Sequence, residues 1–105
     1  MNSKVLGIHH VTAISGAANE NYKFYTQVLG QRLVKRTVNF DDPGVYHLYY
    51  GDRTGSPGTL MTFFPYGGPQ ARKGSGQVAS SAYPVTDLQA WRSRLAEEHV
   101  EFEEV

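Results

Sequence analysis

The sequence contains no cysteine among its 105 residues. This absence excludes disulfide bonds, thiolate nucleophiles and cysteine-ligated zinc sites, and it is compatible with a reducing compartment. An excess of one charge is also missing, because ten basic and ten acidic residues give a formal net charge of zero. Without a global field that attracts polyanions, neither nucleic acid nor an anionic membrane surface is an expected partner.

Long hydrophobic runs are absent as well. No stretch approaches the roughly 18 apolar residues that a membrane-spanning helix needs, and the opening MNSKVLGIHH lacks the apolar segment of a signal peptide. We therefore expect a cytoplasmic protein with no membrane partner. What the sequence does contain is 40% hydrophobic and 12% aromatic residues, which is typical of a chain that folds around one modest core.

The first 66 residues carry the pattern of a strand, a helix and three further strands. Residues 5–14 are rich in β-branched and apolar side chains, and Ser15-Gly16 after them predicts a turn. Apolar residues at helical spacing predict a helix over 17–29, with Gly30 just beyond its end. The β-rich and aromatic runs that follow predict strands over 32–40, 45–51 and 59–65, separated by DDPG and DRTGSPG.

The rest of the chain reads as an incomplete repeat of this unit. The segment YGGPQARKGSG is too rich in glycine to bury a helical or strand face, so it predicts a linker. After it, QVASSAYPV predicts a strand, Asp87 is the expected N-cap of a helix over 88–99, and VEFEEV is typical of the start of another strand. The predicted organisation is a first module over 1–66, a linker over 67–76 and a truncated second module over 77–105.

Two adjacent histidines, His9 and His10, are the first candidates for chemistry. On a regular strand adjacent side chains project to opposite faces, so only one of the two is expected to reach a given ion. His10 shares its face with Thr12, but periodicity does not show which face lines a pocket. On this local pattern alone, a histidine in a strand is more often a structural residue than a ligand.

The other candidates have equally simple interpretations. His47, within YHLYY, suits an inward hydrogen-bonding residue as well as a ligand. His99 is expected to be a solvated residue near the end of the second helix, favoured there by the helix dipole. Aromatic residues of the predicted strands pack in a sheet core more often than they line an aromatic-substrate pocket. These residues are Tyr46, Tyr49, Tyr50, Phe63 and Phe64.

Four segments together resemble a known family: GIHHVTAISG, FYTQVLGQRLVKRTVNFDDPGVYHLYYGD, GSPGTLMTFFP and RKGSGQ. They are similar to the N-terminal part of ring-cleaving extradiol dioxygenases of the hydroquinone type. These enzymes belong to the vicinal oxygen chelate superfamily, alongside glyoxalase I and bleomycin-resistance proteins. The resemblance implies an α+β fold in which βαβββ modules pair into a cup-shaped sheet. This chain would contain one complete module and an incomplete second one.

The same resemblance implies roles for three residues. The second histidine of the HH pair is the metal ligand in that family, which makes His10 the predicted ligand and places His9 and Thr12 in the catalytic pocket around it. The implied cofactor is Fe(II), with Mn(II) as the alternative, in a site of two histidines and one carboxylate. The implied substrate is a small, hydroquinone-like aromatic that binds the metal together with O₂.

The chain departs from the family pattern at one position. Glyoxalase-like modules carry a glutamate ligand on the fourth strand, whereas TLMTFFP contains no acid, and Thr62 or a neighbour occupies that region. The remaining ligands are therefore expected from a missing C-terminal half or from a second copy in a homodimer. On this interpretation the chain alone is an inactive portion of a dioxygenase. The rival interpretation is a metal-free, ligand-sequestering module of the bleomycin-resistance type, which the missing carboxylate favours and the HH pair opposes.

Overall fold

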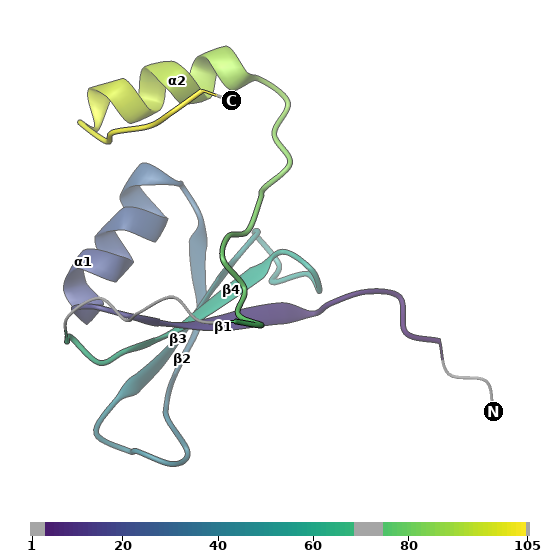
Figure 1. The fold of residues 1–105 in the computed structure, drawn as a ribbon, viewed down its shortest axis with the longest axis vertical. Coiled ribbons are helices and arrows are strands. Elements are labelled where there is room, and N and C mark those ends of the chain that lie inside the picture. The colour runs from purple at the N-terminus through teal and green to yellow at the C-terminus, as the bar shows by residue number, and fades with distance from the viewer. Residues whose placement is uncertain (1–3, 69–74, 105) are drawn as a thin grey trace. The chain divides into compact units, whose positions relative to one another are not determined.

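The structure, a computed structural model, describes residues 4–68 and 75–104, so that part of the predicted linker lies outside the described residues. The chain divides into two compact units, Met1–Gln70 and Ala71–Val105. No described helix is both long and apolar enough to cross a membrane. The elements, drawn in Figure 1, are β1 (His10–Ser15), α1 (Ala18–Lys23), η1 (Phe24–Val28), β2 (Arg32–Val38), β3 (Tyr46–Gly51), β4 (Leu60–Pro65) and α2 (Leu88–Glu97).

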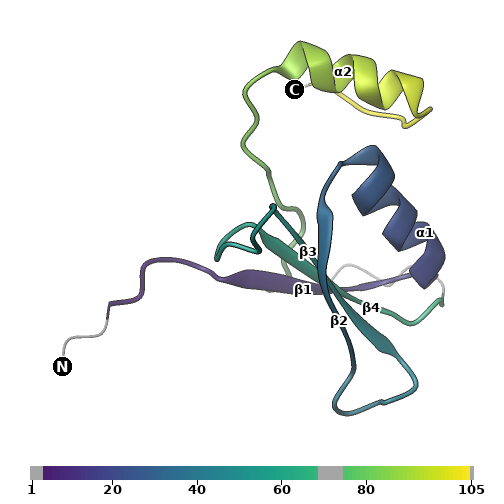
Figure 2. The same ribbon diagram turned by 180° about the vertical axis from the view of Figure 1, so that it is seen from behind.

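The four strands form one mixed sheet in the order β1-β4-β3-β2. β1 runs parallel to β4, with Thr12 opposite Thr62, whereas β3 is antiparallel to both β4 and β2. β1 and β2 are therefore the two edges of the sheet, which Figure 2 shows from behind. The strand, helix and three-strand order of the first module is confirmed, and so is the α+β class.

β1 begins later than the sequence pattern predicts. The predicted strand covered residues 5–14, but pairing with β4 starts at His10, opposite Leu60. Val5 and Leu6 are 96% and 93% exposed in the segment before it. A β-branched run becomes a strand only where a neighbour offers backbone partners, and β4 itself starts at Leu60. This part of the prediction is therefore wrong.

The first helix covers one face of the sheet. The buried residues on that face are Leu48, Tyr50 and Phe63, and Tyr25 packs against them from η1. The Tyr25 ring stacks on Tyr50 with 5.0 Å between centroids and lies 4.8 Å from the centroid of Phe63. Aromatic contacts of this kind contribute about 0.5–1.5 kcal/mol each beyond the burial of their area. This aromatic group is the core of the unit.

The Tyr50 phenol is the one strongly perturbed group of that core. Its side chain is completely buried, and its hydroxyl donates a hydrogen bond to Oδ1 of Asn21 at 2.8 Å. Burial raises the pKa of Tyr50 to about 12, with Tyr22 and Tyr25 adding to the effect. The hydroxyl is thus held in its neutral form by the fold.

The first helix changes its winding halfway along. It is α-helical over α1 and π-helical over η1, where the Leu29 N–H donates to the Phe24 carbonyl at 3.0 Å. Gly30 follows with a φ of +71°, a left-handed conformation that glycine adopts without strain. The helix therefore ends at the glycine that the sequence indicated.

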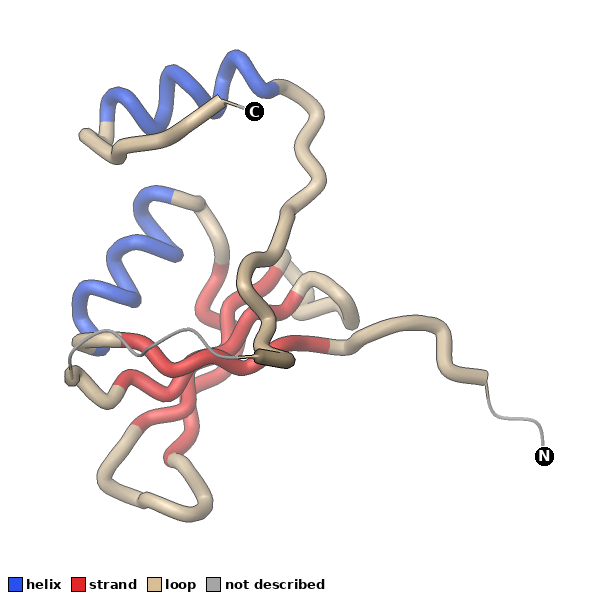
Figure 3. The backbone as a smooth tube through the Cα atoms, in the orientation of Figure 1, coloured by secondary structure: helices blue, strands red, loops and turns tan. Residues whose placement is uncertain are grey.

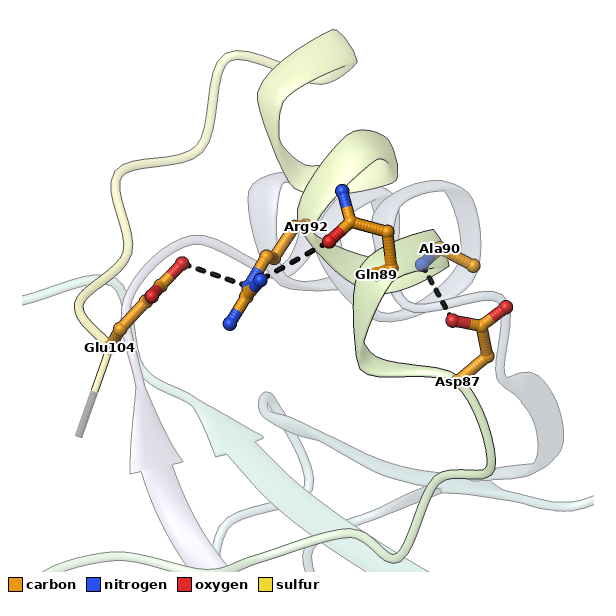
Figure 4. Close-up of polar contacts among 5 residues, drawn as sticks. All are labelled: Asp87, Gln89, Ala90, Arg92 and Glu104. Carbon is orange, nitrogen blue, oxygen red and sulfur yellow. Dashed lines mark hydrogen bonds and ion pairs between the residues drawn. The ribbon is translucent and has the colours of Figure 1, made fainter.

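α2 begins at its predicted cap. The Asp87 carboxylate accepts a hydrogen bond from the Ala90 N–H at 3.1 Å, as Figure 4 shows. Arg92 donates to the side-chain oxygen of Gln89 at 3.2 Å and pairs with Glu104 at 2.8 Å. Both members of this ion pair are largely exposed, so it stabilises the fold by only about 0–1 kcal/mol. It nevertheless joins the segment after the helix to the helix itself.

The two strands predicted in the second unit are not formed. The described residues of QVASSAYPV and VEFEEV are loop, drawn in tan in Figure 3. An extended segment needs a neighbouring strand to satisfy its backbone groups, and the described part of this unit contains no strand that could pair with either one. The composition of these segments favoured strands, but strands did not form because no neighbouring strand is described to pair with them.

α2 also ends earlier than predicted, and His99 lies beyond it. The His99 N–H donates to the Ala96 carbonyl at 3.1 Å, and the Val100 N–H donates to the Leu95 carbonyl at 2.9 Å. These paired bonds are those of a Schellman motif, whose terminating residue is left-handed. His99 has a φ of +56°, which is unfavourable for a residue with a Cβ atom. Its structural role is to end the helix.

Tyr50→Phe is expected to flatten the alkaline limb of the stability curve. The folded pKa of about 12 lies above the ordinary value of 10.0, so folding favours the neutral phenol. The stability that the buried phenol contributes is complete below pH 10. It is lost as the pH rises through the folded pKa, because Tyr50 loses its proton at lower pH in the unfolded chain than in the folded one. Urea unfolding between about pH 8 and pH 11 measures the slope. The exposed Tyr46→Phe is the control, and equal slopes in the variant, the control and the parent chain would contradict the prediction.

His99→Gly is expected to stabilise the end of α2 by about 1 kcal/mol, because glycine removes the Cβ clash at positive φ. Hydrogen exchange of the Val100 amide, which closes the Schellman motif, measures this locally. Exchange should slow about fivefold in the variant. His99→Ala keeps the Cβ atom and should give no gain; similar slowing in both variants would show that the backbone strain is not the cause.

Candidate functional site

The face of the sheet opposite the first helix carries a group of polar side chains. Side chains alternate along a strand, so the neighbours of the buried Leu48, Tyr50 and Phe63 project away from the helix. The burial of β1 alternates in the same way, with its histidine and its threonine on the more exposed side. We refer to the polar side chains of this face, together with His9, which precedes β1, as the open-face cluster. Its members are His9, His10, Thr12, His47, Tyr49 and Thr62.

His9 and His10 contact each other directly. Their Nδ1 atoms are 2.9 Å apart, and their ring centroids are 5.2 Å apart in an edge-on arrangement. The expectation that they project to opposite faces is wrong, because β1 starts at His10 and the alternation of a strand does not apply to His9. One Nδ1 must donate to the other, so the two imidazoles determine each other's tautomer.

Thr12 belongs to a chain of hydrogen bonds that crosses three strands. Its hydroxyl oxygen lies 2.6 Å from that of Thr62, which lies 3.1 Å from Nε2 of His47. Nδ1 of His47 is in turn 3.0 Å from the hydroxyl of Tyr49. Thr62 is completely buried, and His47 and Tyr49 are half-buried. The chain therefore connects β1, β4 and β3 through side chains alone.

The surroundings of His47 disfavour its charged form. Burial lowers the pKa of His47 below 6.5, and electrostatic interactions with His10 and Lys35 lower it further. The Lys35 ammonium lies 5.3 Å from the centre of the Tyr49 ring, so it stands over the same face of the sheet. The Tyr49 ring is in turn 6.1 Å from that of His10. The cluster is thus polar, with the Lys35 ammonium at one side and the Tyr49 ring between Lys35 and His10.

The structure brings the three predicted site residues onto one surface and adds three more. His9, His10 and Thr12 all belong to the open-face cluster. The sequence pattern left His47 between a ligand and a hydrogen-bonding residue, placed Tyr49 in the sheet core more often than in a substrate pocket, and gave no role to Thr62. The only signal in the sequence for Thr62 was its place in the region where, by resemblance, related modules carry a glutamate ligand.

The aromatic residues expected in the sheet core are divided between the two faces. Tyr50 and Phe63 are buried beneath the helix, as predicted. Tyr49 and Phe64 both contact the ring of His47, with centroids 4.2 and 4.1 Å away. Tyr46 is 47% exposed. The core interpretation therefore holds for Tyr50 and Phe63 and is wrong for Tyr46. Tyr49 lies beside Tyr50 in the strand and so projects to the opposite face.

The described residues do not form a complete metal site. No group of three or more histidine, aspartate or glutamate side chains among them is placed to hold one ion. His10 nevertheless has the properties of a single ligand. It is exposed, and within the described part of the chain its hydrogen bond involves Nδ1, not Nε2. The residues present therefore fit one position of a coordination sphere.

His47→Gln is expected to reduce the loss of stability at acidic pH. Because the folded pKa of His47 lies below its ordinary value, the unfolded chain binds the proton first. Stability therefore falls as the pH drops through 6.5 and continues to fall down to the folded pKa, whereas well above pH 6.5 there is no penalty. Urea midpoints between about pH 7.5 and pH 5 measure the slope. His99→Gln, at an exposed position, is the control, and an unchanged slope in His47→Gln would refute the assignment.

Comparison with known sequences gives a consistent result. The sequence profile of the Glyoxalase/Bleomycin resistance protein/Dioxygenase superfamily matches residues 7–105. A Bacillus subtilis (strain 168) protein with the provisional name of ring-cleaving dioxygenase MhqO is 50% identical over 108 residues, which cover 100% of this chain and 35% of the relative. The chlorohydroquinone/hydroquinone 1,2-dioxygenase of Sphingobium indicum is 40% identical over 107 residues, covering 97% and 33%. The chain thus spans about a third of the length of the curated relatives it matches.

Solved structures agree with these matches. A crystal structure of a provisionally named dioxygenase from Bacillus subtilis subsp. subtilis str. 168 aligns with a TM-score of 0.90 at 48% identity, over 99% of this chain and 34% of that one. Glyoxalase I of Leishmania major aligns with a TM-score of 0.74 at 17% identity, over 96% and 73%. The second likeness shows the fold alone.

Proposed function

Because the chain belongs to the Glyoxalase/Bleomycin resistance protein/Dioxygenase superfamily, we propose that it is the N-terminal portion of a metal-dependent, ring-cleaving dioxygenase of the hydroquinone type. The observation that carries this proposal is the extent of the similarity. Identities of 50% and 40% to ring-cleaving dioxygenases run along nearly the whole chain. They include the module on which the open-face cluster is built.

In this proposal His10 is a metal ligand, and His9 fixes the tautomer in which His10 can bind the metal. A neutral imidazole has one protonated nitrogen and one nitrogen with a free lone pair. If Nδ1 of His10 donates to Nδ1 of His9 across their 2.9 Å contact, the lone pair of His10 is on Nε2. That nitrogen is then free to bind a cation. Partners of this kind typically change metal affinity by about 10- to 100-fold.

The proposed metal is Fe(II), with Mn(II) as the alternative. Two imidazoles and one carboxylate around such an ion leave positions where an oxygen of a dihydroxy aromatic and O₂ bind side by side. This chain would supply one of the imidazoles, and the other ligands would come from the remainder of a longer protein or from a second copy. Thr12 and Tyr49 would border the substrate, one with a hydroxyl and one with an aromatic ring.

The metal-free, ligand-sequestering module considered above is not favoured. Its support was the missing carboxylate on the fourth strand. This absence does not separate the two functions, because the chain spans about a third of the dioxygenases it resembles and the other ligands can come from the remainder. The relatives cited above are named as dioxygenases. No described feature separately favours a sequestering role.

A chimera in which this chain replaces the matching third of MhqO tests the proposed function. We expect the chimera, loaded with Fe(II), to consume O₂ with hydroquinone, and the chain alone to consume none. His10→Ala should reduce the rate at least about 100-fold, and His9→Ala should weaken Fe(II) binding about 10- to 100-fold. His99→Ala is the matched control and should retain full activity.

Two results would contradict the proposal. One is a folded chimera whose oxygen consumption is unaffected by His10→Ala. The other is oxygen consumption by the chain alone, which would mean that its own residues complete the site.

A further inference from the structure

We propose that Tyr49, His47, Thr62 and Thr12 form a polarised hydrogen-bond relay that holds the Thr12 hydroxyl as a donor toward an oxyanion bound beside His10. The relay itself follows from the hydrogen bonds of the open-face cluster. The identity of the oxyanion, a phenolate oxygen of a dihydroxy aromatic, rests on the proposed function. In this arrangement His47 and Thr62 are positioning residues that act through Thr12.

Burial forces the members of the relay to pair with one another. Thr62 is completely inaccessible to solvent, so water cannot replace either of its partners. Its hydroxyl has a single proton and lies 2.6 Å from the Thr12 oxygen and 3.1 Å from Nε2 of His47. It must therefore donate in one direction and accept from the other. A buried hydroxyl left without a partner costs about 1–3 kcal/mol.

The direction of donation follows from the chemistry of the two ends. A phenol is a stronger donor than an alcohol, and its oxygen is the weaker acceptor, whereas the unprotonated nitrogen of imidazole is a strong acceptor. Tyr49 therefore donates to Nδ1 of His47 across 3.0 Å, and the imidazole carries its proton on Nε2. Nε2–H then donates to Thr62, and Thr62 donates to Thr12. The Thr12 proton is left for a partner outside the relay.

The outcome at Thr12 does not depend on the charge of His47. Burial and electrostatic interactions with His10 and Lys35 lower the pKa of His47, which favours the neutral form. Protonation would place a proton on both ring nitrogens, and Nε2–H would still donate to Thr62. The end of the relay at Thr12 is a donor in both states.

Both ends of the relay lie next to His10. Thr12 follows His10 by two residues on the same side of β1, a spacing of about 6.5 Å along a strand. The ring of Tyr49 lies 6.1 Å from that of His10. A ligand held at His10 would therefore meet a hydroxyl donor on one side and an aromatic ring on the other. Such a surface selects an anionic or strongly accepting oxygen over a neutral donor.

The tautomer of His47 tests the relay directly. In the ¹⁵N-histidine-labelled chain at about pH 8, where imidazole is neutral, long-range ¹H–¹⁵N spectra should show His47 protonated on Nε2. Tyr49→Phe, which removes the donor to Nδ1, should shift the population toward the Nδ1–H form. A predominant Nδ1–H form in the parent chain would overturn the proposal, because the relay would then run from Thr12 to Tyr49.

A second set of variants separates a relay from ordinary packing. In the Fe(II)-loaded MhqO chimera, Thr62→Val should raise the KM for hydroquinone about five- to tenfold, the effect of about one hydrogen bond. Thr62→Ser retains the hydroxyl and should stay within about twofold of the parent chimera. Thr12→Val should cost as much as Thr62→Val, and the double variant no more than either, because both break the same donor.

The results distinguish the relay from the proposed function. Equal effects of Thr62→Val and Thr62→Ser, or additive effects in the double variant, would overturn the relay while hydroquinone binding stands. A folded, Fe(II)-loaded chimera whose rate does not saturate with hydroquinone would overturn the proposed ligand. The His47 tautomer would then still decide whether the relay exists.

Discussion

The parallel pairing of β1 with β4 is the constraint on which the open-face cluster depends. It sets Thr12 opposite Thr62 and so joins positions that are 50 residues apart in the chain. The same register starts β1 at His10 and leaves His9 outside the strand, where its ring contacts that of His10. A slip of one residue would turn His10 and Thr12 toward the helix-covered face. The polar surface exists only in this register.

One face of the sheet provides the hydrophobic core, and the other carries hydrogen-bonded polar side chains. Beneath the helix, Tyr25, Tyr50 and Phe63 form an aromatic core that supplies the hydrophobic stabilisation of the unit. On the other face, His47 and Thr62 are paired through side-chain hydrogen bonds, which satisfy buried polar groups and contribute little net stability. Such a face adds little to the free energy of unfolding. It is consistent with a surface that recognises a polar ligand.

One end of each helix could be predicted from local patterns, whereas the bounds of the strands could not. The helix stop at Gly30 and the cap at Asp87 were predictable because each depends on a few neighbouring residues. The start of β1 and the strands expected in QVASSAYPV and VEFEEV were not, because a strand depends on a partner that composition does not reveal. His47 is the comparable case in the site. Its neighbours suggested hydrogen bonding, but its partner Thr62 is fifteen residues away on another strand.

The sequence by itself determined the order of elements in the first module, the glycine that ends its helix, the Asp87 cap of α2, and the resemblance that points to His10. Each of these is encoded in short-range periodicity or in a recognisable stretch of residues. Only the tertiary structure decided which face of the sheet is open, and that Thr12, Thr62, His47 and Tyr49 form one hydrogen-bonded chain. The physical reason is that a period of two defines two faces without saying which one the helix will cover. The helix and the strand register, both set by long-range packing, make that choice.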